Sequence, residues 1–277
     1  MSTVIICILV MAVTGILAAL LLWGAGKRFH VDEDPRIDAI EALLPGANCG
    51  GCGRSGCREF ASACVKADSL TGLTCPGSPA EVMDRIADIV GLKAEAVTPQ
   101  VAVLACGGTC EARPLRAVYD GVESCAVMRL VSAGARDCAF GCLGCGDCVR
   151  SCPFGAMRMD PTTGLPVIDE AKCTGCGVCT RTCPRSILHL RPHGPRGLRV
   201  WVACSNTLKG TLAMKDCRAA CIGCGKCLRT CPHGAITVSD NLARIDPAPC
   251  KLCRKCVAVC PTGAIHTSGF PLSPQSV

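Results

Sequence analysis

Aromatic residues are scarce in this sequence. Five Phe, two Trp and one Tyr make up 3% of its 277 residues. Aromatic side chains supply much of the buried area in ordinary protein interiors. A large conventional hydrophobic core is therefore not expected, and something other than aromatic packing must organise the fold.

The sequence also lacks the usual marks of nucleotide binding and of side-chain catalysis. It contains no phosphate-binding loop, no flavin signature and no arrangement of a nucleophile with a base that can be argued from the residues. We therefore expect no catalytic residue in this chain and no cofactor site other than metal sites.

Charge is absent from residues 3–23. At 1.5 Å per residue, this apolar run reaches about 30 Å as a helix, the thickness of the hydrocarbon layer. Trp23 stands where an interfacial aromatic belongs, Lys27 and Arg28 follow, and no positive residue precedes the run. The positive-inside rule predicts a single-pass anchor at residues 1–26 in the inner membrane, with the rest of the chain on the cytoplasmic side.

A cleaved signal peptide is the alternative for this segment. Signal peptides begin with a charged region and carry a shorter apolar run, and neither feature is present. Cys7, inside the run, is expected to be an inert apolar residue.

Cysteine is abundant where aromatics are few: the chain has 28, about a tenth of its residues. Such a density indicates either a disulfide framework or a metal protein. In the reducing cytoplasm predicted above, disulfides are disfavoured, so the cysteines are expected to be thiols or metal ligands.

Four segments share the pattern C-x2-C-x2-C-x3-C-P and begin at Cys142, Cys173, Cys221 and Cys250. The first and third are 79 residues apart at every cysteine, and the second and fourth 77. The chain therefore contains a duplicated unit with two motifs in each copy. Three thiolates on one tight loop suit three irons of a cubane, glycines allow the loop to turn, and proline suits the following helix.

The pattern resembles that of bacterial two-cluster ferredoxins. In those proteins the fourth cysteine of each motif binds the other cluster of the pair. The resemblance implies four [4Fe–4S] ligand sets in this chain: Cys142, Cys145, Cys148 and Cys183; Cys173, Cys176, Cys179 and Cys152; Cys221, Cys224, Cys227 and Cys260; Cys250, Cys253, Cys256 and Cys231.

Zinc is the alternative metal for these motifs. Zinc sites usually pair two C-x2-C units across a longer loop, often with histidine, and four repeats of the present pattern do not fit. The fourth motif differs from the others because Leu252 and Arg254 replace its glycines. This change is expected to alter hydrogen bonding and potential without abolishing binding.

A different cysteine pattern lies near the anchor. Cys49, Cys52, Cys57 and Cys75 are spaced C-x2-C-x4-C-x17-C. They are expected to hold one further [4Fe–4S] cluster, the fifth. Cys64 is a competing ligand, and Cys75 is preferred because Pro-Gly follows it.

Two helices are predicted to flank these cysteines within a small helical domain at residues 32–92. The first starts with Asp34 as N-cap and Pro35 in its first turn, and Pro45-Gly46 end it. The second is expected to start with Ser78 as N-cap in a capping box with Glu81 and to stop at Gly91. Their predicted apolar faces contain Ile37, Ile40 and Leu44 in the first helix and Val82, Ile86, Ile89 and Val90 in the second.

An N-terminal membrane helix, a C-x2-C-x4-C-x17-C domain and then ferredoxin motifs together resemble the B subunits of Rnf complexes, in the longer form with two ferredoxin-type pairs. The family is that of membrane-bound, ion-translocating ferredoxin:NAD oxidoreductases. The resemblance implies an electron-transfer subunit that accepts electrons from reduced soluble ferredoxin and relays them toward the other subunits. It also implies that the NAD site belongs to those other subunits.

The expected fold is therefore α+β, with an anchor, a helical 4Fe–4S domain and two ferredoxin-like modules. The predicted boundaries are 1–26 for the anchor, 32–92 for the helical domain, 93–137 for a connecting cysteine-containing segment, 138–195 for module 1, 196–212 for a strand-containing linker and 213–270 for module 2.

Six cysteines remain beside Cys7 and Cys64. Cys106, Cys110, Cys125 and Cys138 are a candidate set for a sixth cluster, with buried structural thiols as the alternative. "VAVLAC" and "LRVWVAC" read as matching strands that lead to Cys106 and Cys204, and Cys138 and Cys217 each stand four residues before a ferredoxin loop. Cys204 and Cys217 lack two partners in sequence and are not expected to hold a cluster alone.

The formal charge of +7 suggests nucleic acid as a partner, but five clusters at roughly −2 each would bring the charge to about −3. The basic residues are also scattered, so no nucleic-acid partner is expected. Two other functions compete with the Rnf-type relay: a polyferredoxin component of a hydrogenase or formate dehydrogenase, and a cluster-stabilised scaffold or nucleic-acid-binding protein.

Overall fold

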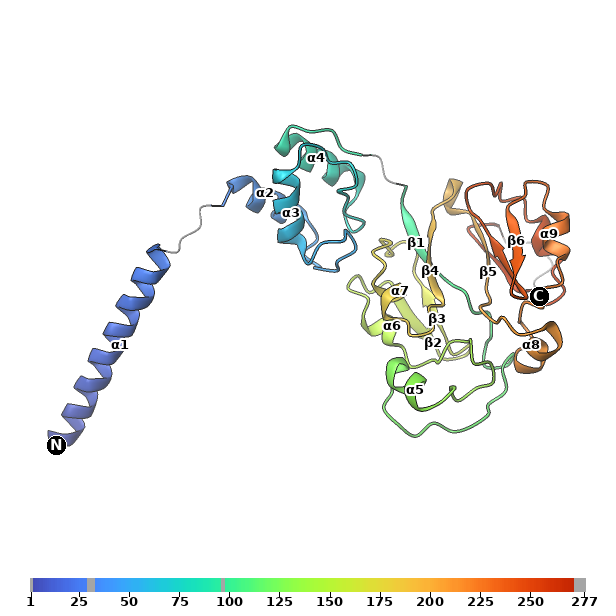
Figure 1. The fold of residues 1–277 in the computed structure, drawn as a ribbon, viewed down its shortest axis with the longest axis horizontal. Helices are drawn as coiled ribbons and strands as arrows, with labels where there is room; N and C mark the ends of the chain where they lie inside the picture. The colour runs from blue at the N-terminus through green and yellow to red at the C-terminus, as the bar shows by residue number, and fades with distance from the viewer. Residues whose placement is uncertain (1, 29–32, 96–97, 272–277) are drawn as a thin grey trace.

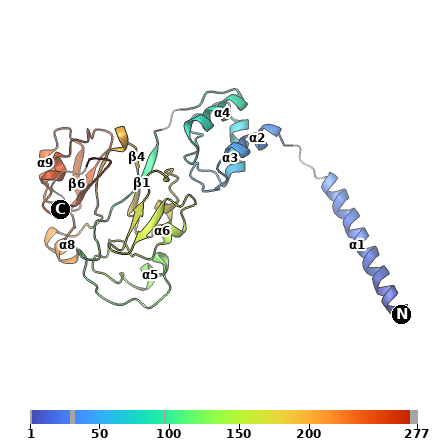
Figure 2. The same cartoon turned by 180° about the vertical axis from the view of Figure 1, so that it is seen from behind.

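The computed structural model describes residues 2–28, 33–95 and 98–271. The fold is mixed α+β, as predicted: a long N-terminal helix, a small helical unit, and two modules built from short strands and helices (Figure 1). The same arrangement is seen from behind in Figure 2.

The apolar run forms helix α1 (Ser2–Arg28). A stretch of 18 residues within Thr3–Arg28 has a mean hydropathy of 3.0, and this stretch is not buried against the rest of the chain. The ammonium group of Lys27 lies 5.6 Å from the ring centre of Trp23. A helix of this length and composition is consistent with a membrane anchor.

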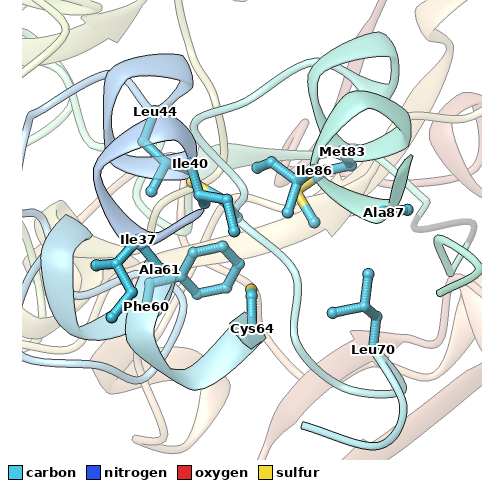
Figure 3. Packing of buried hydrophobic residues seen from close by; sticks show 11 residues of the cluster. Ile37, Ile40, Leu44, Phe60, Ala61, Cys64, Leu70, Met83, Ile86 and Ala87 are labelled. Atoms are coloured by element: carbon cyan, nitrogen blue, oxygen red, sulfur yellow. The ribbon is translucent and has the colours of Figure 1, made fainter. Parts of the chain in front are cut away.

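Three helices form the small unit after the anchor: α2 (Pro35–Leu43), α3 (Cys57–Lys66) and α4 (Ala80–Val90). Their buried side chains meet in one core, and among the described residues of this core Phe60 is the single aromatic one (Figure 3). Ile40, Phe60 and Ile86 are almost completely shielded from solvent. This core positions the cysteines of the N-terminal site.

The start of α2 is as predicted, whereas that of α4 is not. The Asp34 side chain accepts a hydrogen bond from the Arg36 amide, and Pro35 opens the helix. At α4 the N-cap is Pro79, whose carbonyl accepts from the Val82 and Met83 amides. Ser78 lies one residue too early to cap the helix.

The buried face of α4 also differs in part from the prediction. Ile86 is central, but Met83 and Ala87 are the other buried residues, and Val82, Ile89 and Val90 are only half-buried. The helix ends at Gly91, as predicted, because this residue takes a left-handed conformation with φ of 73°.

Module 1 combines two short helices with two antiparallel strand pairs. Helices α6 (Asp147–Arg150) and α7 (Val178–Thr182) follow the two cysteine loops. Strand β2 (Met157–Asp160) pairs with β3 (Leu165–Ile168), and β4 (Leu188–Pro192) pairs with β1 (Gln100–Leu104). The strand expected before Cys106 is therefore present and completes this module.

Module 2 repeats the plan. Helices α9 (Lys226–Thr230) and α10 (Lys255–Ala258) follow its cysteine loops. Strand β6 (Ile236–Ser239) pairs with β7 (Leu242–Ile245), and β8 (Ile265–Ser268) pairs with β5 (Arg199–Val202). The strand expected before Cys204 is β5.

Three further elements connect these parts: α5 (Cys125–Val131) precedes the first ferredoxin loop, the 3₁₀ turn Pro195–Gly197 joins the modules, and α8 (Gly210–Asp216) precedes the third loop. The modules lie side by side (Figures 1 and 2). Trp201 donates from Nε1 to the Leu104 carbonyl across this contact, at 2.9 Å.

Cysteine sulfurs occupy the interior of both modules. Cys148 and Cys179 are buried among Leu, Ile and Met side chains in module 1, and Cys227 and Cys256 hold the equivalent places in module 2. In both modules, cysteine sulfurs therefore fill the part of the core that aromatic side chains fill in many proteins.

Candidate iron–sulfur cluster sites

Each ferredoxin-type module contains two cavities, and cysteines from both of its motifs line each one. In module 2, one cavity of about 360 Å³ is lined by Cys221, Cys224, Cys227 and Cys260. A second, of about 340 Å³, is lined by Cys231, Cys250, Cys253 and Cys256. Three cysteines of one loop therefore meet the fourth cysteine of the other motif, the exchange implied by the ferredoxin resemblance.

Module 1 has the same arrangement with one difference. A cavity of about 330 Å³ is lined by Cys152, Cys173, Cys176 and Cys179. The other, of about 380 Å³, is lined by Cys142, Cys148 and Cys183, with Cys125 from helix α5. Cys145, the remaining member of the expected set, lies beside Cys125, and burial together with that thiol raises the pKa of Cys145 to about 12.

The loops adopt the turns that the glycines predict. Gly225 has a φ of 70° and caps α9 in the left-handed conformation. In the fourth motif Leu252 and Arg254 take the same conformation, with φ of 57° and 59°. Residues with a Cβ pay roughly 1–2 kcal/mol for this conformation, so the fourth loop is formed at a cost that the other three avoid.

Backbone N–H groups point at several of these sulfurs. The Ala102 amide lies 3.4 Å from Cys173 Sγ, the Ala156 amide 3.4 Å from Cys152 Sγ, and the Ala243 amide 3.5 Å from Cys221 Sγ. Hydrogen bonds of this kind stabilise the anionic form of a sulfur ligand and raise the potential of the group it holds.

Burial favours the neutral thiol at these sites. It raises the pKa of Cys142 and of Cys179 to about 12, with neighbouring cysteines adding to the effect. Buried thiols become good ligands only when metal replaces the proton, so binding and deprotonation are coupled.

The N-terminal cysteines gather at the ends of helices and loops. Cys57 opens α3, and its amide donates to Asn48 Oδ1 at 2.8 Å. Cys75 is buried, and burial, followed by the charges of Cys52 and Cys49, raises its pKa. Cys64 points into the helical core and is fully buried there (Figure 3).

The loop that carries Cys49 and Cys52 packs directly on module 1. Arg181 donates from Nη2 to the Cys49 carbonyl at 2.9 Å. A Cβ added to Gly51 would lie 2.7 Å from the Cys176 carbonyl oxygen, so glycine is required for this approach. The N-terminal site therefore adjoins the set that contains Cys176.

In the parts of the chain that the structure describes, no three His, Cys, Asp or Glu side chains surround a point suited to a single metal ion. A cubane separates its four thiolates at its corners. A site for such a cluster is therefore of a different kind from a single-ion site.

The candidate sixth set does not come together. Cys125 lines the first cavity of module 1, and the Cys110 amide bonds to the Thr163 carbonyl at 2.9 Å. Cys106 and Cys138 instead meet Cys204 and Cys217 at a fifth cavity. The sequence did contain a sign of this second grouping, because Cys106 and Cys138 occupy the same places in the first copy as Cys204 and Cys217 in the second. The candidate set chosen from sequence instead followed the order of cysteines along the chain.

Family comparisons agree with this layout. Two models described as "4Fe-4S dicluster domain" match residues 141–187 and 220–264, and residues 172–235. A model described as "Putative Fe-S cluster" matches residues 44–69. Both kinds of cysteine pattern therefore correspond to iron–sulfur families.

Several curated proteins are similar over most of the chain. The B subunit of the proton-translocating ferredoxin:NAD(+) oxidoreductase complex of Clostridium ljungdahlii is 44% identical over 90% of this chain and 87% of its own length. The B subunit of the Na(+)-translocating complex of Acetobacterium woodii is 40% identical over 87% of this chain and 71% of its own length. The B subunit of an ion-translocating oxidoreductase complex from Methanosarcina acetivorans is 38% identical over 90% and 93%, respectively.

Proposed function

The chain belongs to the Rnf family of B subunits of ion-translocating ferredoxin:NAD oxidoreductases, and from this membership we propose that it accepts electrons from reduced ferredoxin and relays them through its clusters toward membrane partners. It is an electron-transfer subunit of the complex. NAD reduction and ion movement are assigned to other subunits. The similarity of this chain to whole B subunits favours this function over the hydrogenase and scaffold alternatives.

Five clusters are proposed, held by the four ferredoxin-type sets and by Cys49, Cys52, Cys57 and Cys75. For the four ferredoxin-type clusters, the observation that carries this proposal is the shared lining of each cavity by cysteines of two motifs. For the fifth, it is the proximity of Cys75 to Cys52 and Cys49. A bound [4Fe–4S] cluster supplies a one-electron carrier whose potential depends on its charge, its hydrogen bonds and its exposure.

The protein's own contribution to the relay is spacing and environment. Cys148 lies close enough to Cys179 for their charges to interact, so the two cavities of module 1 adjoin. Cys49 likewise lies close enough to Cys176 for their charges to interact, so the N-terminal site is next to module 1. These contacts support an unbroken path from module 1 to the domain beside the anchor.

We further propose that α1 holds the chain in the inner membrane with its clusters on the cytoplasmic side. Lys27 and Arg28 at the end of α1 support this orientation. Soluble ferredoxin would then reach the modules directly, and basic residues beside the cluster loops offer complementary charge to an acidic donor. No nucleic-acid partner is proposed.

The division of labour is tested with the isolated full-length chain in detergent. Reduced ferredoxin should bleach its iron–sulfur absorbance, whereas NADH formation should require the assembled complex. NADH formed by the isolated chain would contradict the proposal. So would a chain that stays oxidised in the presence of reduced ferredoxin.

A further inference from the structure

Four cysteines outside the ferredoxin motifs line a cavity between the two modules. Cys106 follows β1, Cys204 follows β5, and Cys138 and Cys217 precede the first and third loops. The cavity measures about 270 Å³, compared with 330 to 380 Å³ for the four ferredoxin-type cavities. We propose that these four cysteines bind a sixth [4Fe–4S] cluster, which joins module 1 to module 2.

Each copy of the duplicated unit supplies two of the four ligands. The Ala105 amide bonds to the Ile187 carbonyl at 2.7 Å, and the equivalent Ala203 amide bonds to the Ala264 carbonyl at 2.8 Å. These paired bonds fix the cysteine that follows each alanine at the same point of its module. The site therefore arises from the contact of the two copies, and neither copy can form it alone.

Small residues leave room at the centre of this contact. The rest of the lining is mainly Ala and Gly: Ala105, Gly107, Gly108, Gly141, Ala203, Ala219 and Ala220. A Cβ on Gly108 would lie 2.6 Å from the Arg113 side chain. Glycine at position 108 therefore lets Arg113 pack against the backbone here, and the remaining lining residues besides the cysteines are Arg113, Phe140, Ser205 and Asn206.

The sulfurs already receive N–H groups at the distances found in the ferredoxin-type sets. The Cys142 amide lies 3.4 Å from Cys106 Sγ, and the Asn206 amide lies 3.4 Å from Cys204 Sγ. Asn206, which is 1% exposed, also points Nδ2 at Cys138 Sγ at 3.7 Å. N–H donors that point at a sulfur stabilise its thiolate form, which is the form that binds metal. Cysteines that serve only apolar packing do not need such donors.

A buried positive charge faces the same cavity. Arg113 is 3% exposed and donates to the Gly108 and Cys142 carbonyls at 2.7 and 2.8 Å. None of the ion pairs in the described ranges includes Arg113. Buried charges are normally paired with an opposite charge, and a cluster with four thiolates supplies a net charge of roughly −2.

The location gives this site a role that rests on the proposed relay function. Cys106 adjoins Cys142 of the first set, and the Cys221 amide hydrogen-bonds to Cys204, which brings the third set equally close. A cluster here lies between the two modules. It would complete a continuous series of sites from module 2 to the N-terminal domain.

Iron content tests the binding site without reference to electron flow. The purified full-length chain with its clusters should contain about twenty-four iron atoms, four more than five clusters require. A reproducible value of about twenty, with all five other clusters present by EPR, would overturn the proposal even if no variant could be made.

Variants then locate the extra iron. Cys204→Ser and Cys217→Ser should each lower the content by about four atoms, or leave a new [3Fe–4S] EPR signal from the remaining thiolates. Cys110→Ser is the matched control, because Cys110 belongs to the same segment but not to the cavity, and it should lose no iron. Unchanged iron and EPR spectra in both Cys204→Ser and Cys217→Ser would contradict the site.

The bridging role has its own readout. In the assembled complex, Cys204→Ser should reduce ferredoxin-dependent NADH formation at least tenfold while one module is still reduced by ferredoxin at the normal rate. Normal turnover with the sixth cluster absent would contradict the role of this cluster in joining the modules. It would not contradict the binding site or the proposed relay function. Loss of ferredoxin oxidation in the unmodified complex would instead contradict the relay.

Discussion

Arg181 holds the loop of the N-terminal site through one bond: its Nη2 donates to the Cys49 carbonyl at 2.9 Å. The equivalent side chains in two other motifs serve their own loops. Arg150 donates to the Cys145 carbonyl at 2.8 Å, and Arg229 to the Cys224 carbonyl at 3.4 Å. In the second motif, the equivalent arginine therefore bonds to a loop of the neighbouring helical domain and not to its own loop.

Arg181→Ala should loosen the packing of residues 49–53 on module 1. Loss of one hydrogen bond of about 1 kcal/mol predicts roughly fivefold faster hydrogen exchange in this loop. Arg229→Ala is the control, because it removes the equivalent side chain in module 2 and should leave the exchange of residues 49–53 unchanged. Equal exchange in Arg181→Ala and the unmodified chain would show that the bond does not hold the domains together.

Cys52→Ala should remove the N-terminal cluster and leave the four ferredoxin-type clusters intact, because its ligands lie in a separate helical domain. Three remaining thiolates can retain a [3Fe–4S] species, so EPR is the required measurement. If this domain passes electrons to the membrane partners, the variant should accept electrons from ferredoxin normally but pass them on slowly. Normal turnover without the N-terminal cluster would rule out this direction of flow.

Cys64 and Cys75 provide a matched pair for the fourth ligand of that site. Cys64 lies in the helical core, and burial raises its pKa to about 11. Cys64→Ala should therefore retain the cluster and lose only about 1 kcal/mol of stability, the cost of a small buried group. Cys75→Ala should lose the cluster, and the reverse result would make Cys64 the ligand.

Deletion of residues 1–26 should release the chain from membranes with its clusters intact. Each cluster site has its ligands outside α1, and no part of α1 is buried against other elements. Physiological electron flow should fall, because an anchor raises the effective concentration near the partners. An unrelated apolar helix of the same length in place of α1 should restore membrane attachment. If the shortened chain stays on washed membranes, partner contacts hold it there.

Local patterns made much of this molecule predictable. The motif spacing identified the cysteine loops, and the resemblance to two-cluster ferredoxins implied which cysteines share a cavity. Asp34 and Gly91 mark helix ends through their own side chain or backbone. The start of α4 was missed because Pro79 caps through its carbonyl, which gives no side-chain signal. Helix α3 was missed because its N-cap, Gly56, has no side chain, and the side chain that accepts from the Cys57 amide belongs to the distant Asn48.

The grouping of Cys106, Cys138, Cys204 and Cys217 lies beyond such patterns for a different reason. It depends on how two copies pack against each other, and the intervals between these cysteines are too long to define a loop. The equivalence of the copies was visible in sequence, but the equivalence alone does not reveal that corresponding residues face one another. Contacts between the copies bring them together: Trp201 donates to the Leu104 carbonyl, the Gly107 amide to the Ala203 carbonyl at 2.6 Å, and the Ser205 hydroxyl to the Ala105 carbonyl at 2.9 Å.

The final prediction concerns an ion pair that joins the modules. Arg199, 3% exposed on β5, bonds to Glu170 of module 1, and Ser268 Oγ donates to the same carboxylate at 2.6 Å. Partial burial raises the pKa of Glu170, but the bonds from Arg199 and Ser268 outweigh it and hold that pKa below its ordinary value. Glu170→Ala leaves a buried guanidinium without its carboxylate, so we expect a loss of about 1–3 kcal/mol, nearer the lower value because Glu170 is partly exposed.

Thermal unfolding of the chain with its clusters measures this effect. The unfolding temperature should fall by several degrees in Glu170→Ala, whereas Lys172→Ala, which removes an exposed pair with Asp169, should change it little. A carboxylate with a lowered pKa stabilises the fold above its unfolded pKa and loses this effect only as the pH falls through the folded pKa. The difference between Glu170→Ala and the unmodified chain should therefore be constant from about pH 8 to about pH 6. A difference that grows as the pH falls from about 8 to about 6 would mean that the pKa of Glu170 is raised, and that Arg199 does not hold the carboxylate in its charged form.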